Sequence, residues 1–395
     1  MNGSFRFARF HDQFLLTNDA GRFAFLPPED FSRFVHHQLP HDSETWQRLQ
    51  ENFFCYDTDR EVYLRSVMAA VRENHAHLFS PTSLFILAVA NRCNNACVYC
   101  QANGGAKCAD LDIPTARKII DRIAASPAKH LTIEFQGGEP LMNWQGVKDL
   151  VKYGREQEKL HDKHFRFTLT TNGVLLNDEI MEFANKEMDN VVLSIDGRKE
   201  VHDRMRPFRK GAGSYDLIVP KFQKFAESRH QDKYYVRGTY THFNTDFSKD
   251  VLHLADLGFK QISVEPVVAQ PTDEYALKES DLPVLFDEYD RLAAEMVKRN
   301  KAGNGFNFFH FMIDLEGGPC VYKRLSGCGS GTEYLAVTPW GDLYPCHQFV
   351  GNEDFLMGNV WDGIKATDIQ DEFKCCNVYA KEKCRNCFAR FYCSG

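Results

Sequence analysis

The chain has 395 residues, of which 43% are hydrophobic and 26% are charged, proportions that suit a globular protein with a real core. The net charge is −7 and no basic block stands out, which argues against a nucleic acid as partner. The start of the chain has no apolar secretory segment, and the longest apolar run, LFILAVA at 84–90, is too short to cross a bilayer. We therefore expect a cytoplasmic protein without a membrane partner.

Residues 1–80 read as the first of three segments, in agreement with a length that favours two or three domains. Three short strand-like pieces come first: FRFARF, FLLTND and RFAFL, with Asp-Ala-Gly as a turn between the last two. Three helical patterns follow, beginning at PPEDF, SETWQ and DREVY. This order outlines a winged-helix-like module, and a plain amino-terminal lid is the alternative.

Residues 81–300 alternate between short apolar strands and helices. The six predicted strands are 84–90, 131–135, 165–171, 191–195, 234–241 and 262–268. A helical pattern follows each strand, with starts near residues 114, 145, 178, 215, 248 and 281. Because these strands are largely apolar, we expect a parallel sheet that is buried on both faces. The fold class is α/β, with a partial (β/α)6 barrel favoured over an open doubly wound sheet.

Residues 301–395 are rich in turns and cysteines and have little helical period, so we expect metal clusters to organise this segment. The chain has 13 cysteines. Disulfides are rare in a reducing compartment, so clustered cysteines there favour metal binding or catalysis.

The stretch RCNNACVYC places Cys93, Cys97 and Cys100 directly after the first strand of this alternating segment. In barrels of this class, active sites lie on the loops that follow the strands. A structural zinc site closes with a fourth protein ligand, whereas a [4Fe–4S] cluster held by three cysteines keeps one iron open. The open position favours a cluster that acts on a bound molecule.

The motif FQGGEP follows the second strand of this segment and supplies Gly137, Gly138 and Glu139. Two glycines allow a backbone to approach a ligand closely. Glu139 adds a fixed acceptor and Pro140 stiffens the turn. An isolated GGEP would be weak evidence, but here it comes one strand–helix unit after the three-cysteine loop.

Together, CNNACVYC and GGEP resemble the radical S-adenosylmethionine (SAM) enzymes. The resemblance implies a [4Fe–4S] cluster on Cys93, Cys97 and Cys100, with SAM on the open iron and its amino group at the GGEP strand end. Tyr99 matches the aromatic residue whose backbone lies near the adenine.

The same resemblance carries over to two further loops of the alternating segment. Ser194 in LSIDG matches a contact to the SAM ribose or carboxylate, and Arg206 in HDRMR matches the arginine that pairs with the SAM carboxylate. The alternatives are a strand-end cap for Ser194 and a solvated loop charge for Arg206. Glu265 either lines the SAM or substrate pocket or is a rim carboxylate.

The carboxyl-terminal cysteines resemble a SPASM extension, which implies two auxiliary [4Fe–4S] clusters. Auxiliary cluster I would use Cys320, Cys328 and Cys346, and auxiliary cluster II would use Cys384, Cys387 and Cys393. Each set lacks a fourth cysteine, so we expect the chain to be truncated at its end. Zinc at the Cys384–Cys387 pair is the alternative. The remaining cysteines, assigned as small buried hydrophobes, are Cys55, Cys108, Cys375 and Cys376.

Stretches such as NVVLSIDGRKEVHDRMR and GTEYLAVTPWGDLYPCHQF resemble the maturases of SCIFF peptides (six cysteines in forty-five residues), and the first 80 residues look more like His-Xaa-Ser system maturases. This resemblance implies a thioether cross-link, made by hydrogen abstraction with a 5′-deoxyadenosyl radical, on a ribosomal precursor peptide of the sactipeptide or ranthipeptide type. The implied partners are that peptide, whose leader would bind the 1–80 module by strand addition, and a flavodoxin- or ferredoxin-type reductant.

Two alternative functions share these motifs. One is another radical SAM/SPASM reaction, either a carbon–carbon cross-link in a His-Xaa-Ser type peptide or formylglycine formation as in anaerobic sulfatase maturases. The other is a non-catalytic iron–sulfur scaffold or electron carrier, against which the complete GGEP motif argues.

Overall fold

The computed structural model describes residues 1–74, 76, 81–100, 109–312, 325, 327–385, 387, 389 and 392. The chain divides into two compact units. Unit 1 consists of residues 1–80, 315–329 and 371–395, and unit 2 of residues 81–314 and 330–370. The expected carboxyl-terminal segment 301–395 is therefore shared between the two units and is not a compact body of its own.

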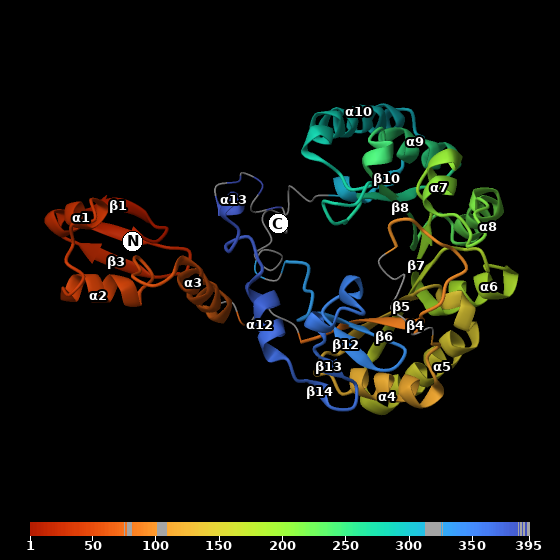
Figure 1. Cartoon of the computed structure of the whole chain (residues 1–395), viewed down its shortest axis with the longest axis horizontal. Helices are drawn as coiled ribbons and strands as arrows, with labels where there is room; N and C mark the ends of the chain where they lie inside the picture. Colours follow the sequence, from red (N-terminus) through yellow and green to blue (C-terminus); the bar gives the residue numbers. More distant parts are fainter. Residues whose placement is uncertain are drawn as a thin grey trace. The chain divides into compact units, whose positions relative to one another are not determined.

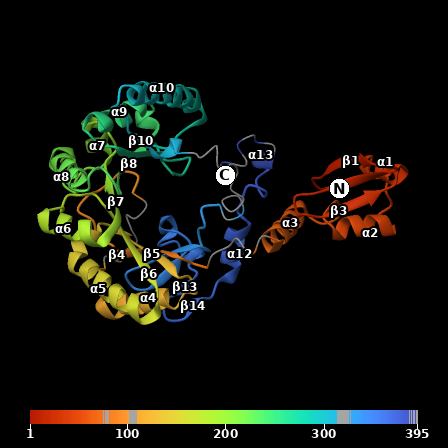
Figure 2. The same cartoon turned by 180° about the vertical axis from the view of Figure 1, so that it is seen from behind.

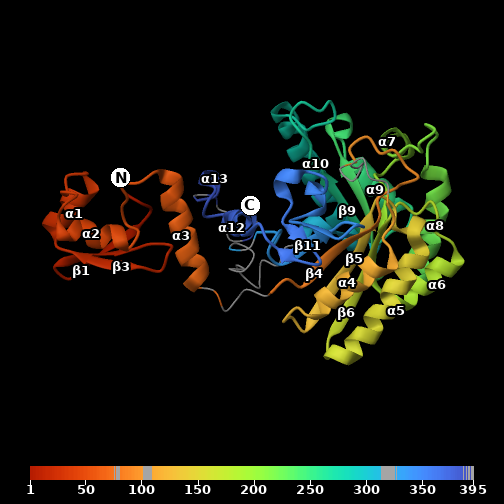
Figure 3. The ribbon, with the colours of Figure 1, turned by 60° about the horizontal axis from the view of Figure 1, so that its bottom comes forward.

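Unit 1 begins with the three predicted strands followed by the three predicted helices. The elements are β1 (Arg6–Phe10), β2 (Gln13–Thr17), β3 (Phe23–Leu26), α1 (Pro28–Val35), α2 (Glu44–Glu51) and α3 (Arg60–Asn74). The strands form an antiparallel sheet in the order β1-β2-β3. Figure 3 shows α1 and α2 on the same face of this sheet, where Leu16 and Leu26 pack against Phe34, Trp46 and Leu49.

Helix α3 packs within unit 1 against residues from the distant end of the chain. Tyr63, Val67 and Met68 form a second small core with Leu325, and Tyr379 packs at its edge. Unit 1 also contains α13 (Glu382–Arg385). This unit therefore combines residues from both ends of the sequence, whereas the sequence predicts a module of residues 1–80 alone.

Unit 2 is built on six parallel strands that lie side by side in chain order. They are β4 (Leu84–Ala90), β5 (His130–Gly137), β6 (His164–Thr171), β7 (Met188–Ser194), β8 (Tyr234–Tyr240) and β9 (Gln261–Pro266). Each strand pairs in parallel with the next one. In a doubly wound sheet the spatial order of the strands reverses at a switch point. Here neighbouring strands follow the chain order throughout, which agrees with the predicted partial barrel.

Helices cover the outer, convex side of this curved sheet (Figures 1 and 2). They are α4 (Ile113–Ala124), α5 (Trp144–His161), α6 (Asp178–Glu187), α7 (Lys199–Met205), α8 (Tyr215–Ser228), α9 (Ser248–Asp256) and α10 (Leu282–Lys301). Two of these helices have side-chain caps at their starts: Asp112 accepts from the Thr115 amide and Asn177 from the Ile180 amide. Within the described part of the chain, no helix combines the length and apolarity needed to cross a bilayer.

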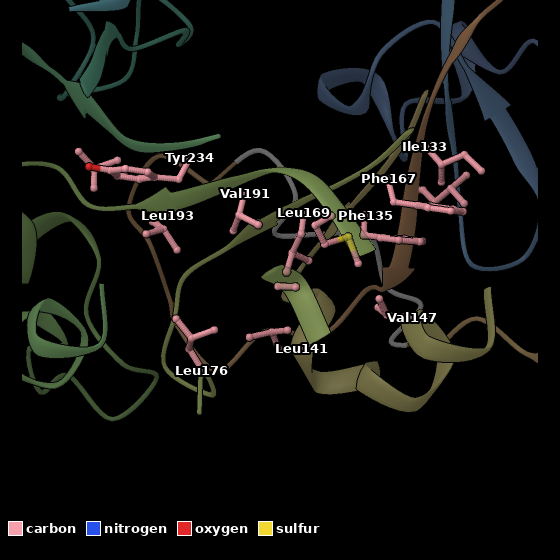
Figure 4. Packing of buried hydrophobic residues seen from close by; sticks show 14 of the residues in the cluster. Ile133, Phe135, Leu141, Val147, Phe167, Leu169, Leu176, Val191, Leu193 and Tyr234 are labelled. Carbon is pink, nitrogen blue, oxygen red and sulfur yellow. The ribbon is translucent and has the colours of Figure 1, made fainter. Parts of the chain in front are cut away.

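Most of the six strands carry polar residues on one of their two faces, which corrects the expectation of a sheet buried on both faces; β4 is the exception and is apolar on both. In β5 the residues Leu131, Ile133 and Phe135 are fully buried, whereas the intervening Glu134 and Gln136 are only partly buried. Figure 4 shows Ile133 and Phe135 packed with Phe167, Val191 and Leu193 of the neighbouring strands. An open barrel leaves its inner face to line a cavity, so polar residues are stable there.

The sheet continues beyond the six predicted strands. The added elements are β10 (Asn307–Phe308), β11 (Tyr334–Val337), β12 (Asp342–Tyr344), β13 (Gly358–Asn359) and β14 (Gly363–Ile364). Strand β11 pairs in parallel with β4, and β12 to β14 follow as antiparallel neighbours. Helix α12 (Thr367–Cys375) comes after them. Residues 330–364 therefore contain regular sheet, which a segment described only as rich in turns and cysteines did not predict.

Candidate active site

The carboxyl ends of the parallel strands surround a cavity in unit 2. Its wall includes all three cysteines of the predicted cluster loop and all six residues that were predicted to contact SAM. The predicted residues that line it are Cys93, Tyr99, Gly137, Gly138, Glu139, Ser194, Arg206, Cys97 and Cys100. The fold therefore brings together side chains that lie up to 113 positions apart in the sequence.

The cysteine loop is held in place by the segment that follows α7. The amides of Ala96 and Val98 donate to the carbonyls of Pro207 and Met205, at 2.8 and 2.9 Å. The Arg209 side chain adds a hydrogen bond of 2.7 Å from Nε to the Cys93 carbonyl. Backbone pairing on this scale fixes the path of the loop before any ligand binds.

The glycine pair of GGEP is needed for contact between two backbones. The Gly138 amide donates to the Ala90 carbonyl at 2.8 Å and the Glu139 amide to the Arg92 carbonyl at 2.9 Å. A Cβ on Gly137, whose φ is +127°, would lie 2.5 Å from the Ala90 oxygen, and one on Gly138 would lie 2.3 Å from the Arg92 oxygen. The motif therefore joins the end of β5 to the start of the cysteine loop, besides lining the cavity.

Glu139 is buried, and protein groups satisfy its carboxylate. It accepts hydrogen bonds from the Leu141 amide at 3.0 Å, the Thr171 hydroxyl at 2.7 Å and the Asn172 amide at 2.8 Å. Burial raises the pKa of Glu139 to about 7, and these three donors oppose that shift. In this structure Glu139 therefore ties the end of β5 to the end of β6.

Asp196 organises a buried polar cluster on the opposite side of the cysteine loop. Its carboxylate accepts from the Tyr99 hydroxyl at 2.6 Å, from Arg206 Nε at 2.9 Å and from the Thr239 amide at 3.0 Å. Burial alone would lower the pKa of Arg206, but Asp196 and Tyr99 raise it well above its usual value. Arg206 is therefore not a solvated loop charge, since its side chain is 13% exposed and paired.

His202 extends this cluster away from the cavity. Its Nδ1 accepts from the Asp196 amide at 3.3 Å, and its Nε2 lies 2.9 Å from the Ser214 hydroxyl, which donates to the Arg206 carbonyl. This arrangement requires a neutral ring protonated at Nε2. Burial lowers the pKa of His202 to about 4, so the ring stays neutral at physiological pH.

Charged residues from β8 and β9 complete the cavity wall. Arg237 is paired with Glu265, whose other oxygen accepts from the Ser263 hydroxyl at 3.2 Å. Glu265, for which the sequence allows a pocket or a rim position, lines the cavity together with Arg237. Ser194 also lines the wall at the end of β7.

Sequence reasoning missed several residues of this site. Asp196 and Asn172 come just after the ends of β7 and β6, whereas Arg237 and Thr239 lie within β8. A polar residue just after a buried strand is the signal that could have found Asp196 and Asn172, because parallel strands end at one common edge.

The auxiliary cysteines are only partly described. Cys320 and Cys393 lie outside the described residues, as does Cys108. Cys328, Cys384 and Cys387 belong to unit 1 and Cys346 belongs to unit 2. Among the cysteines assigned as buried hydrophobes, Cys55 is buried, Cys375 is partly exposed and Cys376 is exposed, so that assignment was wrong for Cys376.

In the described part of the chain, no three His, Cys, Asp or Glu side chains are grouped closely enough to hold one metal ion. Cys93, Cys97 and Cys100, which all line the cavity, are the residues that would hold a cluster.

Two further observations support a bound group at this loop. Burial raises the pKa of Cys93 to about 11 and that of Cys97 to about 12, so the thiolates need the positive charge of a metal centre. Among the described residues, three buried polar atoms in this region have no partner: Asn94 Nδ2, Asn95 Oδ1 and Gln136 Oε1. Buried polar atoms are normally satisfied, and Gln136 lines the cavity, so a group bound there would give its side chain a partner.

Comparison with known families finds one match. Residues 87–265 match the model of the Radical SAM superfamily. Domains of that superfamily use a [4Fe–4S] cluster and SAM as cofactors. The matched residues include the cysteine loop, GGEP, Ser194 and Arg206.

The chain is similar to several curated proteins. It is 28% identical to an uncharacterised protein of Methanocaldococcus jannaschii, over 75% of this chain and 94% of that protein. It is 22% identical to the radical SAM cyclopropyl synthase TigE of Paramaledivibacter caminithermalis, over 87% of this chain and 72% of TigE. It is 23% identical to a cysteine-type anaerobic sulfatase-maturating enzyme of Clostridium perfringens, over 71% and 78%.

Two solved structures share the fold. One is anSMEcpe with bound AdoMet and a peptide, with a TM-score of 0.64 and 19% identity, covering 80% of this chain and 89% of that chain. The other is Streptococcus suis SuiB bound to its precursor peptide SuiA, with a TM-score of 0.56 and 16% identity, covering 100% of this chain and 95% of that chain.

Proposed function

We propose that this chain is a radical SAM enzyme that modifies a ribosomally made peptide by forming a thioether between a cysteine sulfur and a carbon. The observation that carries the proposal is the cavity that unites the three-cysteine loop, the GGEP strand end, Ser194 and Arg206. Peptide chemistry is supported by TigE, by the sulfatase-maturating enzyme and by SuiB, whose structure contains a precursor peptide.

Cys93, Cys97 and Cys100 would hold the cluster, and the cavity wall from Gly137 to Arg206 would hold SAM. When bound, these cofactors supply a 5′-deoxyadenosyl radical, which takes one hydrogen atom from the substrate. Thioether formation removes that hydrogen from carbon and one proton from sulfur, and one electron leaves for an acceptor. The auxiliary clusters expected on the Cys320 and Cys384 sets would serve as that acceptor.

The protein's own task is to hold the substrate and to exclude other reactants. The charged pair Arg237–Glu265 faces the cavity, and both partners can hydrogen-bond to peptide groups. The buried outer face of the sheet keeps the strand ends rigid around the site. A rigid, enclosed site is required because a primary carbon radical would otherwise attack any nearby group.

The amino-terminal module is suited to a leader peptide. Strand β1 is exposed along its whole length at the edge of the three-stranded sheet, and Phe7 and Phe10 are 58% and 51% exposed. An extended peptide can add to such an edge through backbone hydrogen bonds, with aromatic side chains giving further contact. A flavodoxin- or ferredoxin-type protein would deliver the electron.

The test is co-expression with short peptides encoded beside the gene, followed by mass spectrometry. A thioether predicts the loss of two hydrogens and one thiol that no longer reacts with an alkylating reagent. A two-hydrogen loss with all thiols still reactive would instead favour carbon–carbon bond formation, as the similarity to TigE suggests. An aldehyde that reacts with hydrazine reagents would favour formylglycine, and an unchanged mass would contradict the proposal for that peptide.

A further inference from the structure

Two N–H groups point to the sulfur of Cys93. The Asn95 amide lies 3.4 Å from Cys93 Sγ, and the side-chain Nδ2 of Asn172 lies 3.5 Å from it. Both distances fit hydrogen bonds to sulfur, which is larger than oxygen. For Cys97, by contrast, it is the positive charge of Arg206 that favours the thiolate, against the rise in pKa that burial causes. The surroundings of the two sulfurs therefore differ.

The orientation of the Asn172 side chain is fixed by its surroundings. Its Oδ1 accepts from the Val174 amide at 3.0 Å, so the NH₂ group must be the one that faces Cys93. The same NH₂ group donates to Asn94 Oδ1 at 2.7 Å, which ties the end of β6 to the cysteine loop. Asn172 is 8% exposed, so water competes little for these bonds.

Glu139 in turn holds the backbone of Asn172. Its carboxylate accepts from the Asn172 amide and from the hydroxyl of Thr171, the preceding residue. The GGEP motif is therefore connected to Cys93 through a chain of hydrogen bonds that runs from Glu139 to Asn172 to the sulfur. Such outer contacts orient a metal ligand and tune the metal centre it binds.

We propose that Asn172 is a positioning residue that donates a hydrogen bond to the Cys93 sulfur and thereby raises the reduction potential of the cluster on Cys93, Cys97 and Cys100. The inference rests on the proposed cluster and deepens it. An N–H donor withdraws negative charge from the ligand sulfur, which favours the more negative, one-electron-reduced cluster. The reduction transfers a single electron from dithionite and needs no proton.

The experiment is a redox titration of the full chain, reconstituted anaerobically with iron and sulfide and poised with dithionite and mediators. The electron paramagnetic resonance signal that changes when SAM is added identifies the relevant cluster. Asn172→Ala should lower its reduced-to-oxidised ratio about tenfold at a fixed potential, which is about 59 mV for a one-electron couple. Asn172→Asp has the same shape with no N–H donor and a negative charge, so it should lower the ratio further.

Asn185→Asp is the matched control, because it adds the same charge on the exposed surface of α6 and should leave the potential unchanged. Iron content shows that each variant carries its cluster. Unshifted potentials in both Asn172 variants, or loss of the cluster from both, would overturn the inference. If the Asn172 variants shift the reduction potential as expected but the wild-type protein cleaves no SAM, the proposed function fails while this inference stands.

Discussion

The guanidinium of Arg206 is paired with the carboxylate of Asp196, with Nε 2.9 Å from Oδ1, and the Asp196 side chain is fully buried. The ring of Tyr99 lies 5.4 Å from the guanidinium carbon and its hydroxyl donates to the same carboxylate. The aromatic residue of the cysteine loop and the arginine after α7 are therefore held by one acidic residue that belongs to neither motif. This cluster positions two of the predicted SAM contacts.

Asp196→Asn should destabilise unit 2 strongly, because it leaves the Arg206 charge without its counter-ion. Removing one partner of a buried ion pair costs about 3 to 5 kcal/mol. Tyr99→Phe is the matched comparison, since it removes one hydrogen bond to Asp196 and should cost about 1 kcal/mol. Urea denaturation gives both free energies of unfolding, and equal costs for the two variants would contradict this role for Asp196.

Gly137→Ala should disrupt the join between β5 and the cysteine loop. The new Cβ would meet the Ala90 carbonyl oxygen at 2.5 Å, at a φ of +127° that alanine avoids. Strain and overpacking together should cost about 3 kcal/mol or more. Gly258→Ala also has a positive φ, +96°, but no atom within 4 Å, and should cost about 1 kcal/mol. Thermal unfolding compares them, and a Gly137 variant as stable as the Gly258 variant would refute the contact.

His202 should make the stability of the site sensitive to mild acid. Burial lowers the pKa of His202 to about 4 in the folded state, whereas an unfolded histidine titrates near 6.5. The stabilisation by neutral His202 is therefore complete above about pH 6.5 and is lost as the pH falls towards 4. Between pH 7 and pH 5 the wild-type protein should lose about 2 kcal/mol through this group.

His202→Gln removes the titration and serves as the reference for that measurement. Its stability should depend less on pH than that of the wild type over the same interval, even if it is lower at pH 7. Denaturant unfolding at both pH values gives the two differences. Parallel pH dependence in the two proteins would show that His202 does not carry the effect.

Most of unit 2 could be predicted from the sequence. The six parallel strands and the helices expected between them lie within a few residues of the predicted positions, because short apolar runs alternate with amphipathic helical patterns. Cys93, Cys97, Cys100 and the GGEP residues could be placed at one edge of the sheet, since they follow consecutive parallel strands.

The remaining features depend on contacts between distant residues. Strand β11 is only four residues long and forms beside β4, about 250 positions away, so no local pattern marks it. The polar inner face was hidden because single polar residues such as Glu134 and Gln136 interrupt otherwise apolar strands. Asn172 could not be assigned to Cys93 because the hydrogen bond joins residues 79 positions apart.

Iron analysis should test the expected auxiliary clusters. Three [4Fe–4S] clusters predict about twelve irons per reconstituted chain, and one cluster predicts about four. Cys384→Ala with Cys387→Ala should remove about four irons, as should Cys328→Ala with Cys346→Ala. A wild-type iron content near four, or zinc bound at the Cys384–Cys387 pair, would contradict the auxiliary clusters and leave the radical SAM site unaffected.

Reductive cleavage of SAM is the most direct test of the central claim. The anaerobically reconstituted chain, mixed with SAM and dithionite, should release 5′-deoxyadenosine and methionine in equal amounts, with or without a peptide. The triple variant Cys93→Ala, Cys97→Ala, Cys100→Ala should release neither above background. A wild-type protein that carries its full iron content and yet forms no 5′-deoxyadenosine would contradict the account.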